Sequence, residues 1–341
     1  MSSTESPQAA IAPAAVPPQG PRLGPGETQR NVSLPGLSLV VRERTSERDG
    51  LEPAVLVHGL GGSSQNWTQL MDRLADRLDS QAPDLPGFGF SPPPDDGDYS
   101  IAGHARAVVR LIESGDRGPV HLFGNSMGGA VATKVAAARP DLVRTLTLVS
   151  PALPELPPQR SAWPTALVSM PGIPALYLRA TRDWPAERRT QELLTLCYGD
   201  ASSVGDRARA EAVEEYERRI ALPYFWDAMV RSTRGIVNAY TLGGQHSLWR
   251  QAERVLAPTL LVYGGRDKLV SFRMARKASR AFRDSRLVTL PDSGHVAMME
   301  HPDVVARAVR DLLDQTDGHV VNDETDARVM NDKTSDAASR S

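Results

Sequence analysis

Gly124-Asn125-Ser126-Met127-Gly128-Gly129 is the stretch of sequence that decides the fold. It follows the apolar, branched run Val120–Phe123, which predicts a buried strand, and it leads into an alanine-rich segment that predicts a helix. A serine at such a strand-to-helix turn is forced into a sparsely populated backbone conformation, which the flanking glycines tolerate because they have no Cβ to clash. The turn therefore predicts that the Ser126 hydroxyl is held out above the sheet, in the position of a nucleophile.

A serine hydroxyl becomes an effective nucleophile when a histidine removes its proton and a carboxylate orients that histidine. His295 follows a predicted strand and lies in the last loop before the C-terminal helix. Asp267 also follows a strand, at the strand ends where sites on open α/β sheets gather. Asp292 competes for the role of the acid, but it is three residues from His295 on the same loop, a poor position for orienting the ring. We therefore predict Ser126, Asp267 and His295 as the catalytic residues.

Two backbone N–H groups are candidates for binding the oxyanion of an acyl-transfer intermediate. One belongs to Met127, directly after the serine and at the start of a helix. The other belongs to Leu60, in the glycine-rich loop His58-Gly59-Leu60-Gly61-Gly62. The same loop could open a dinucleotide-binding fingerprint, but that pattern needs a glycine where the chain has Ser64. We therefore expect an oxyanion hole here and no nucleotide cofactor.

Strand-like and helix-like segments alternate along most of the chain, which predicts an α/β fold with a mostly parallel sheet flanked by helices. Helical periodicity is clear at Trp67, Leu70, Met71, Leu74 and Leu78, over about 271–282, and in the last apolar stripe from Val304 to Leu313. The predicted strands are Leu37–Val41, Ala54–Val57, Val120–Phe123, Leu146–Val149, Thr259–Tyr263 and Leu287–Leu290.

Residues 151–257 interrupt this alternation with a helix-like stretch that holds four of the five tryptophans. Aromatic side chains concentrated in this way suggest a helical cap over an apolar pocket. The chain ends lack the aromatic and most of the branched residues that build a core. We expect a core formed by 31–150 and 258–315, a helical cap insertion over 151–257, and disordered tails over 1–30 and 316–341. The candidate substrate-binding residues are Trp163, Trp184, Trp226 and Trp249.

The composition excludes several classes of protein. The 341 residues are 40% hydrophobic and 23% charged, enough to build a core, and a formal net charge of -2 gives no basic surface for nucleic acid. The single Cys197 cannot form an internal disulfide, and Cys and His nowhere have the spacing of metal ligands. The chain shows neither a membrane span nor a secretory signal. We expect a cytoplasmic protein with no metal, no cofactor and no nucleic-acid partner.

Five motifs resemble those of the α/β-hydrolase superfamily, in particular its capped branch of esterases and carbon–carbon bond hydrolases. The resemblance covers about residues 36–315 and implies an α/β-hydrolase fold with an inserted cap. It also implies that Ser126, Asp267 and His295 are nucleophile, acid and base, and that Leu60 and Met127 supply the oxyanion hole. Epoxide hydrolases and haloalkane dehalogenases would have aspartate in place of the serine. The motifs are HGLGGSSQNW (58–67), PDLPGFGFS (83–91), GNSMGG (124–129), GGRDKLV (264–270) and SGHVAMMEHP (293–302).

The sequence predicts a serine hydrolase that cleaves a carboxylic ester with an apolar acyl or alcohol part through an acyl-enzyme on Ser126. Carbon–carbon bond hydrolysis of a ring-fission product is one alternative, because Asn125 before the serine resembles that class; Val296, however, stands where those enzymes tend to carry an aromatic residue. A ligand-binding protein without turnover is another alternative, against which the complete triad argues. The ring-fission alternative needs a cation for the substrate carboxylate, with candidates Arg179, Arg182, Arg188, Arg189, Arg231 and Arg234.

Overall fold

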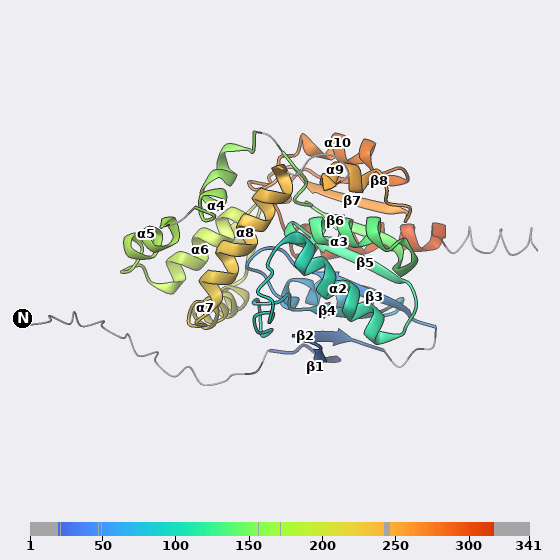
Figure 1. Ribbon diagram of the computed structural model, residues 1–341, viewed down its shortest axis with the longest axis horizontal. Coiled ribbons are helices and arrows are strands. Elements are labelled where there is room, and N and C mark those ends of the chain that lie inside the picture. Colours follow the sequence, from blue (N-terminus) through green and yellow to red (C-terminus); the bar gives the residue numbers. More distant parts are fainter. Residues whose placement is uncertain are drawn as a thin grey trace, which may run out of the picture.

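The computed structural model describes residues 20, 22–46, 48, 50–155, 157–170, 172–241 and 246–316. Within these residues the centre of the molecule is an eight-stranded sheet: β1 (Glu27–Leu34), β2 (Leu37–Arg44), β3 (Glu52–Val57), β4 (Leu78–Pro83), β5 (Val120–Asn125), β6 (Val143–Val149), β7 (Thr259–Gly264) and β8 (Ser285–Leu290). The strands lie in the order β1-β2-β4-β3-β5-β6-β7-β8 (Figure 1). β2 pairs antiparallel with β1 and β4, and all other neighbours are parallel. The prediction of an α/β fold with a mostly parallel sheet is confirmed.

Helices cover both faces of the sheet, because successive residues of a buried strand point to opposite faces. In β3, Val55 and Val57 join one hydrophobic cluster, whereas Ala54 and Leu56 join the other. The first cluster includes residues of α2 (Ile101–Gly115), α3 (Met127–Ala138), α9 (Leu248–Ala252) and α10 (Met274–Ala281). The second includes residues of α1 (Thr68–Leu74), α11 (Ala297–Glu300) and a helix over 302–316.

Between β6 and β7 the described residues form helices and no strand. We call residues 151–257 the inserted segment. Its helices from α4 to α8 lie together beside one end of the sheet, whereas α9 lies over the sheet (Figure 1). The bounds are α4 (Trp163–Leu167), α5 (Ile173–Ala180), α6 (Ala186–Cys197), α7 (Asp206–Ile220), α8 (Phe225–Thr241) and the 3₁₀ turns Arg160–Ala162 and Ala201–Ser203; two more 3₁₀ turns lie in the core, Ser64–Trp67 and Pro140–Leu142.

The structure corrects the predicted boundary of the N-terminal tail. β1 begins at Glu27, so residues 27–30 belong to the sheet and not to a tail. Their ladder to β2 and the buried ion pair between Glu27 and Arg42 hold them there. Residues 20 and 22–26 of the predicted tail are described and precede β1 without helix or strand, residues 1–19, 21 and 317–341 lie outside the described residues, and residue 316 is the last of the C-terminal helix.

The structure also corrects the predicted helix that ended at Leu78. α1 ends at Leu74, and Leu78 is the first residue of β4. Leu78 is buried in the hydrophobic cluster that contains α1. A buried leucine at this spacing fits the end of a helix and the start of a strand equally well, so the apolar period did not distinguish them. The strand itself was missed because its interior carries the polar residues Ser80 and Gln81, both buried where β4 lies between β2 and β3.

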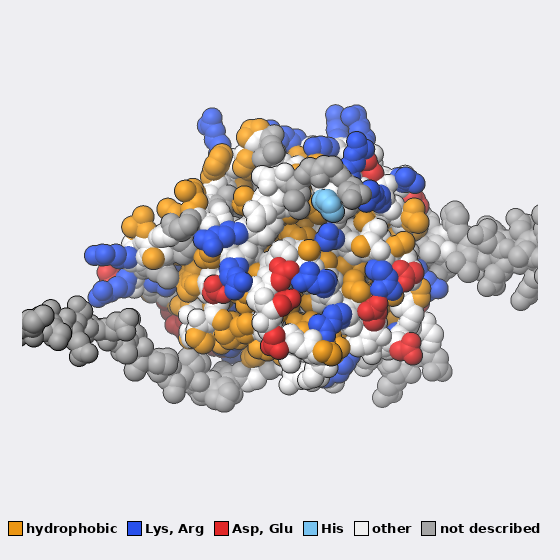
Figure 2. Space-filling view, viewed as in Figure 1, with side chains coloured by type: hydrophobic (Ala, Val, Ile, Leu, Met, Phe, Trp, Pro, Cys, Tyr) orange, Lys and Arg blue, Asp and Glu red, His pale blue; other side chains and the backbone are white. Residues whose placement is uncertain are grey.

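Charged side chains of both signs are interspersed on the face shown in Figure 2. Elsewhere in the described structure, too, charges of opposite sign pair, as Arg106 does with Asp98 at 2.8 Å. This face offers no extended surface of one charge, in keeping with the net charge of -2.

Candidate active site

Ser126 occupies the turn between β5 and α3 with φ 52° and ψ −118°. A positive φ at a residue with a side chain is strained and persists only where the surroundings impose it. Close packing imposes it here. A Cβ on Gly124 would lie 2.4 Å from the Gly128 carbonyl oxygen, and a Cβ on Gly128 would lie 2.2 Å from the Val57 carbonyl oxygen. The turn thus has the strained geometry that its glycines predict.

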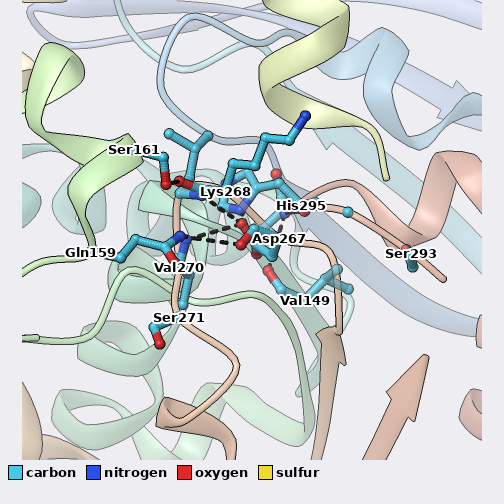
Figure 3. Close-up of polar contacts among 12 residues, drawn as sticks. Val149, Gln159, Ser161, Asp267, Lys268, Val270, Ser271, Ser293 and His295 are labelled. Atoms are coloured by element: carbon cyan, nitrogen blue, oxygen red, sulfur yellow. Dashed lines mark hydrogen bonds and ion pairs between the residues drawn. The ribbon is translucent and has the colours of Figure 1, made fainter. Parts of the chain in front are cut away.

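Asp267 and His295 meet just past the C-terminal ends of β7 and β8 (Figure 3). His295 Nδ1 lies 2.9 Å from Asp267 Oδ2, and both side chains are buried. Asp267 Oδ1 accepts hydrogen bonds from the N–H groups of Leu269 at 2.8 Å and Val270 at 2.9 Å. Burial alone would raise the pKa of Asp267, but His295 and these N–H groups outweigh it and hold the pKa below its ordinary value. An ionised Asp267 fixes Nδ1 of His295 as the donor and leaves Nε2 to accept a proton.

Asn125 links the serine turn to the loop that carries His295. Its buried Nδ2 donates to the carbonyl oxygens of Val149 at 3.1 Å and His295 at 3.0 Å. Within the described residues the Ser126 hydroxyl has no hydrogen-bond partner, so no bond joins it to His295. The fold therefore brings His295 and Asp267 into contact, and Asn125, the residue before Ser126, is bonded to the loop that carries His295.

The competing acid, Asp292, points away from the site. Its side chain is 76% exposed and pairs with Arg266 at 2.7 Å. The side chain of Asp267 is fully buried beside His295. The two candidates, which the sequence placed on similar loops, therefore differ completely in solvation.

The inserted segment forms hydrogen bonds to the loops that carry His295 and Asp267, a feature that sequence reasoning missed. The His295 N–H donates to the Cys197 carbonyl oxygen, at the end of α6, at 2.7 Å. Lys268 Nζ donates to the Thr195 carbonyl oxygen at 2.6 Å. Gln159 Nε2 donates to the Asp267 carbonyl oxygen at 3.2 Å, and Figure 3 shows this side chain and Ser161 reaching the acid loop. The positions of the acid and the base thus depend on helices outside the core.

Residues 59–62 form a tight turn beside the serine. The Gly62 N–H donates to the Gly59 carbonyl oxygen at 3.1 Å, and Gly61 takes the positive φ of 66° that such a turn needs. His58 Nδ1 lies 2.7 Å from the same Gly59 oxygen, while its Nε2 accepts the Leu85 N–H at 2.9 Å. This pattern requires the neutral tautomer with the proton on Nδ1, and burial favours it by lowering the pKa of His58.

The turn aims the Leu60 N–H. The Gly59 carbonyl and the Leu60 N–H belong to one planar peptide and point in opposite directions. The Gly62 N–H and His58 Nδ1 both bind the Gly59 carbonyl oxygen, and in this way they fix the direction of the Leu60 N–H. A Cβ on Gly59 would lie 3.1 Å from Ser126 Cβ, which puts the turn directly against the serine. Met127 is the first residue of α3, where N–H groups have no intrahelical acceptor. Both predicted donors therefore lie next to the serine.

The four predicted substrate-binding tryptophans lie in four different surroundings. Trp163 begins α4 and is 49% exposed, and Trp184 stacks with an arginine of α6. Trp226 packs against neighbouring aromatic rings of the inserted segment, and Trp249 donates from Nε1 to the Pro154 carbonyl oxygen at 3.0 Å. In the part of the chain that the structure describes, none of these contacts reaches the predicted catalytic residues.

Arg219 of α7 is a cation near the site that sequence reasoning did not select. Its Nη1 donates to the Gly61 carbonyl oxygen, and its side chain is 16% exposed. Three of the selected arginines, Arg189, Arg231 and Arg234, instead donate to backbone carbonyls away from the predicted triad. A helical sequence does not show which of its arginines faces the core.

Among the described residues, no group of three or more His, Cys, Asp or Glu side chains is arranged to hold a metal ion. The described helices also include none that is long and apolar enough to cross a membrane.

A protein-family profile described as "alpha/beta hydrolase fold" matches residues 53–302. A pimeloyl-[acyl-carrier protein] methyl ester esterase from Neisseria meningitidis serogroup C is 30% identical over 280 residues, which cover 80% of this chain and 98% of that protein. A monoacylglycerol lipase from Xenopus laevis is 25% identical over 290 residues, which cover 81% of this chain and 80% of that protein.

Solved structures share the same architecture. A membrane phospholipase A, described as a bacterial virulence factor, superposes with a TM-score of 0.70 at 23% identity, over 85% of this chain and 87% of that chain. A meta-cleavage product hydrolase from Pseudomonas fluorescens IP01 superposes with a TM-score of 0.68 at 19% identity, over 84% of this chain and 97% of that chain. At these identities the likeness concerns the fold alone.

Proposed function

The chain belongs to the α/β-hydrolase family, and on that premise we propose that it is a serine hydrolase that cleaves carboxylic esters through an acyl-enzyme on Ser126. The observation that carries the proposal is a serine held at φ 52° directly after Asn125, whose side chain bonds to the loop of the buried pair of His295 and Asp267. Strained residues of this kind cluster at active sites, and among the described residues the Ser126 hydroxyl has no competing hydrogen-bond partner. The names of the relatives, a methyl ester esterase and a monoacylglycerol lipase, support ester bonds.

In the proposed mechanism the Ser126 oxygen attacks the ester carbonyl while its proton passes to His295 Nε2. The carbonyl oxygen becomes an oxyanion, which accepts hydrogen bonds from the N–H groups of Leu60 and Met127. When the intermediate collapses, the bond to the alcohol breaks and the leaving oxygen takes the proton from Nε2. Water then attacks the acyl-enzyme in the same way, which releases the acid and restores the serine. Asp267, buried and ionised, stabilises the imidazolium in both halves.

We also propose that residues 151–257 act as a cap over a core formed by 31–150 and 258–315. Contacts from α6 to the acid and base loops, and from α7 to the turn at 59–62, support this role. Trp163, Trp184, Trp226 and Trp249 stay the predicted apolar lining of this cap, and the cytoplasm stays the predicted location. Asn125, the residue that suggested a ring-fission hydrolase, donates to two backbone carbonyls, which favours a structural role for it.

Steady-state rates on p-nitrophenyl esters of graded chain length test the proposal. Each methylene buried in an apolar site contributes about 0.8 kcal/mol, so kcat/KM should rise up to about fourfold per CH₂ before a steric limit. The gain should appear in KM, because apolar contacts stabilise ground and transition states alike. Ser126→Ala should remove most turnover, whereas Asp292→Asn, an exposed change beside the base loop, serves as the matched control. Equal turnover by wild type and Ser126→Ala would refute the proposed function, and a flat series would refute an apolar acyl site.

A further inference from the structure

Two helices of the inserted segment converge on one glycine of the turn at 59–62. Arg219 of α7 donates from Nη1 to the Gly61 carbonyl oxygen. Met229 of α8 covers the same residue, since a Cβ on Gly61 would lie 3.1 Å from the Met229 sulfur. The arginine crosses from the inserted segment to the core, and its guanidinium ends on the turn that carries Leu60. The contact is therefore made to the backbone of the proposed oxyanion hole.

The Gly61 carbonyl is the start of a continuous hydrogen-bonded chain. It shares a peptide with the Gly62 N–H, which donates to the Gly59 carbonyl oxygen at 3.1 Å. The Gly59 carbonyl in turn shares a peptide with the Leu60 N–H. A donor on a carbonyl polarises that peptide and makes its N–H a stronger donor, and successive bonds strengthen one another. A cation at Gly61 thus acts on Leu60 N–H through two peptides.

The charge of Arg219 is available for this effect. Its side chain is 16% exposed, and its Nε has no hydrogen-bond partner among the described residues. The nearest acid, Glu215, lies 3.6 Å from that Nε and is held more closely by Arg218, at 2.7 Å. Burial lowers the pKa of Arg219, yet a guanidinium stays protonated in proteins. A buried charge of this kind is weakly screened.

We propose that Arg219 is a positioning residue that orients and polarises the Leu60 N–H through the peptides of Gly61 and Gly59. The inference rests on the proposed function, because it concerns the oxyanion of that reaction. It couples catalysis to the inserted segment, since the core supplies the oxyanion donor and α7 supplies the cation behind it. A reaction that develops no negative charge at this position would gain nothing from the arrangement.

The neighbouring Arg218 provides a matched control. It lies on the same helix, carries the same charge and pairs with the same Glu215. Its Nη2 donates to the Gly89 carbonyl oxygen at 3.1 Å, outside the turn at 59–62. Replacing Arg218 therefore changes the helix and its ion pair without removing the cation from the oxyanion turn.

The test compares Arg219→Met, Arg219→Lys and Arg218→Met by kcat and KM on p-nitrophenyl butyrate, and by inhibition with an alkyl trifluoromethyl ketone, which forms an oxyanion on the serine. Loss of an entire oxyanion donor costs about 10²–10³ in rate, so a weakened donor should cost about tenfold. We expect Arg219→Met to lower kcat about tenfold with little change in KM, and to weaken the ketone by the same factor. Arg219→Lys should recover most of both, and Arg218→Met should stay near wild type.

Three results would overturn the inference: equal kinetics for Arg219→Met and Arg218→Met, a loss confined to KM, or a loss seen only with esters that carry a carboxylate, as for an anion subsite. If Arg219→Met fails to fold, the comparison of Arg219→Lys with Arg219→Gln tests the inference instead. Only the lysine variant keeps the positive charge, so only it should retain affinity for the ketone. Wild-type turnover that does not require Ser126 would refute the proposed function itself. Turnover that requires Ser126 but is indifferent to Arg219 would refute only the positioning role.

Discussion

Ser126→Gly should make the protein more stable while it destroys the nucleophile. The serine is at φ 52° and ψ −118°, where a Cβ is strained by about 1–3 kcal/mol. Glycine adopts this conformation freely, but it loses about 0.5–1 kcal/mol more backbone entropy on folding. The hydroxyl makes no hydrogen bond among the described residues, so its removal costs little. At the middle of both ranges the balance is a gain of about 1 kcal/mol relative to Ser126→Ala, which keeps the Cβ and the strain.

Urea unfolding of Ser126→Gly and Ser126→Ala, together with their melting temperatures, measures this balance. At about 2–4 °C per kcal/mol, the glycine variant should melt several degrees above the alanine variant. Ser247→Gly is the matched control, because Ser247 also precedes a helix without a side-chain capping bond but has φ −59°. That change should be neutral or destabilising. A glycine variant at position 126 that is no more stable than the alanine variant would refute the reasoning that the turn is strained.

Three further predictions concern the acid, a buried histidine and a packed glycine. Asp267→Asn should lower kcat by about 10⁴, because an amide can hold the base in the wrong tautomer, whereas the exposed Asp292→Asn should leave steady-state rates nearly unchanged; the reverse order would contradict the choice of acid. Burial lowers the pKa of His104 to about 3, so the unfolded chain binds a proton that the folded one rejects. The free energy of unfolding should therefore fall by up to about 1.4 kcal/mol per pH unit as the pH drops below about 6.5. His104→Gln should remove this contribution to the pH dependence of the free energy of unfolding, measured by urea titrations at several pH values. An unaltered pH dependence would contradict the lowered pKa of His104. Gly128→Ala should destabilise the protein by about 3 kcal/mol, because its Cβ would lie 2.2 Å from the Val57 carbonyl oxygen; an unchanged melting temperature would show that the elbow is less tightly packed.

Local sequence was sufficient for the serine turn because its chemistry is local. A short run of glycines around Ser126, between an apolar strand and a small-residue helix, leaves few other conformations. Strands buried on both faces, such as β5 and β7, were predicted for the same reason. β4 was not, because Ser80 and Gln81 interrupt its apolar run.

Long-range contacts were beyond sequence reasoning. Asp267 and Asp292 both follow a strand, and only the fold shows that one is buried and the other 76% exposed. Arg219 reaches a carbonyl 158 residues away, and nothing in its helix distinguishes it from its neighbour Arg218. The aromatic composition that marked the inserted segment does not show which contacts each ring makes. Its tryptophans illustrate this, because each lies in different surroundings.

Mass spectrometry after reaction with a fluorophosphonate shows directly whether Ser126 is the nucleophile, because this reagent phosphonylates a serine that is activated as a nucleophile. We expect a single adduct on the peptide that contains Ser126, its absence in Ser126→Ala, and much slower labelling in Asp267→Asn. Failure of the folded wild-type protein to form an adduct, or labelling of Ser126→Ala at the wild-type rate, would contradict the claim that Ser126 is the nucleophile.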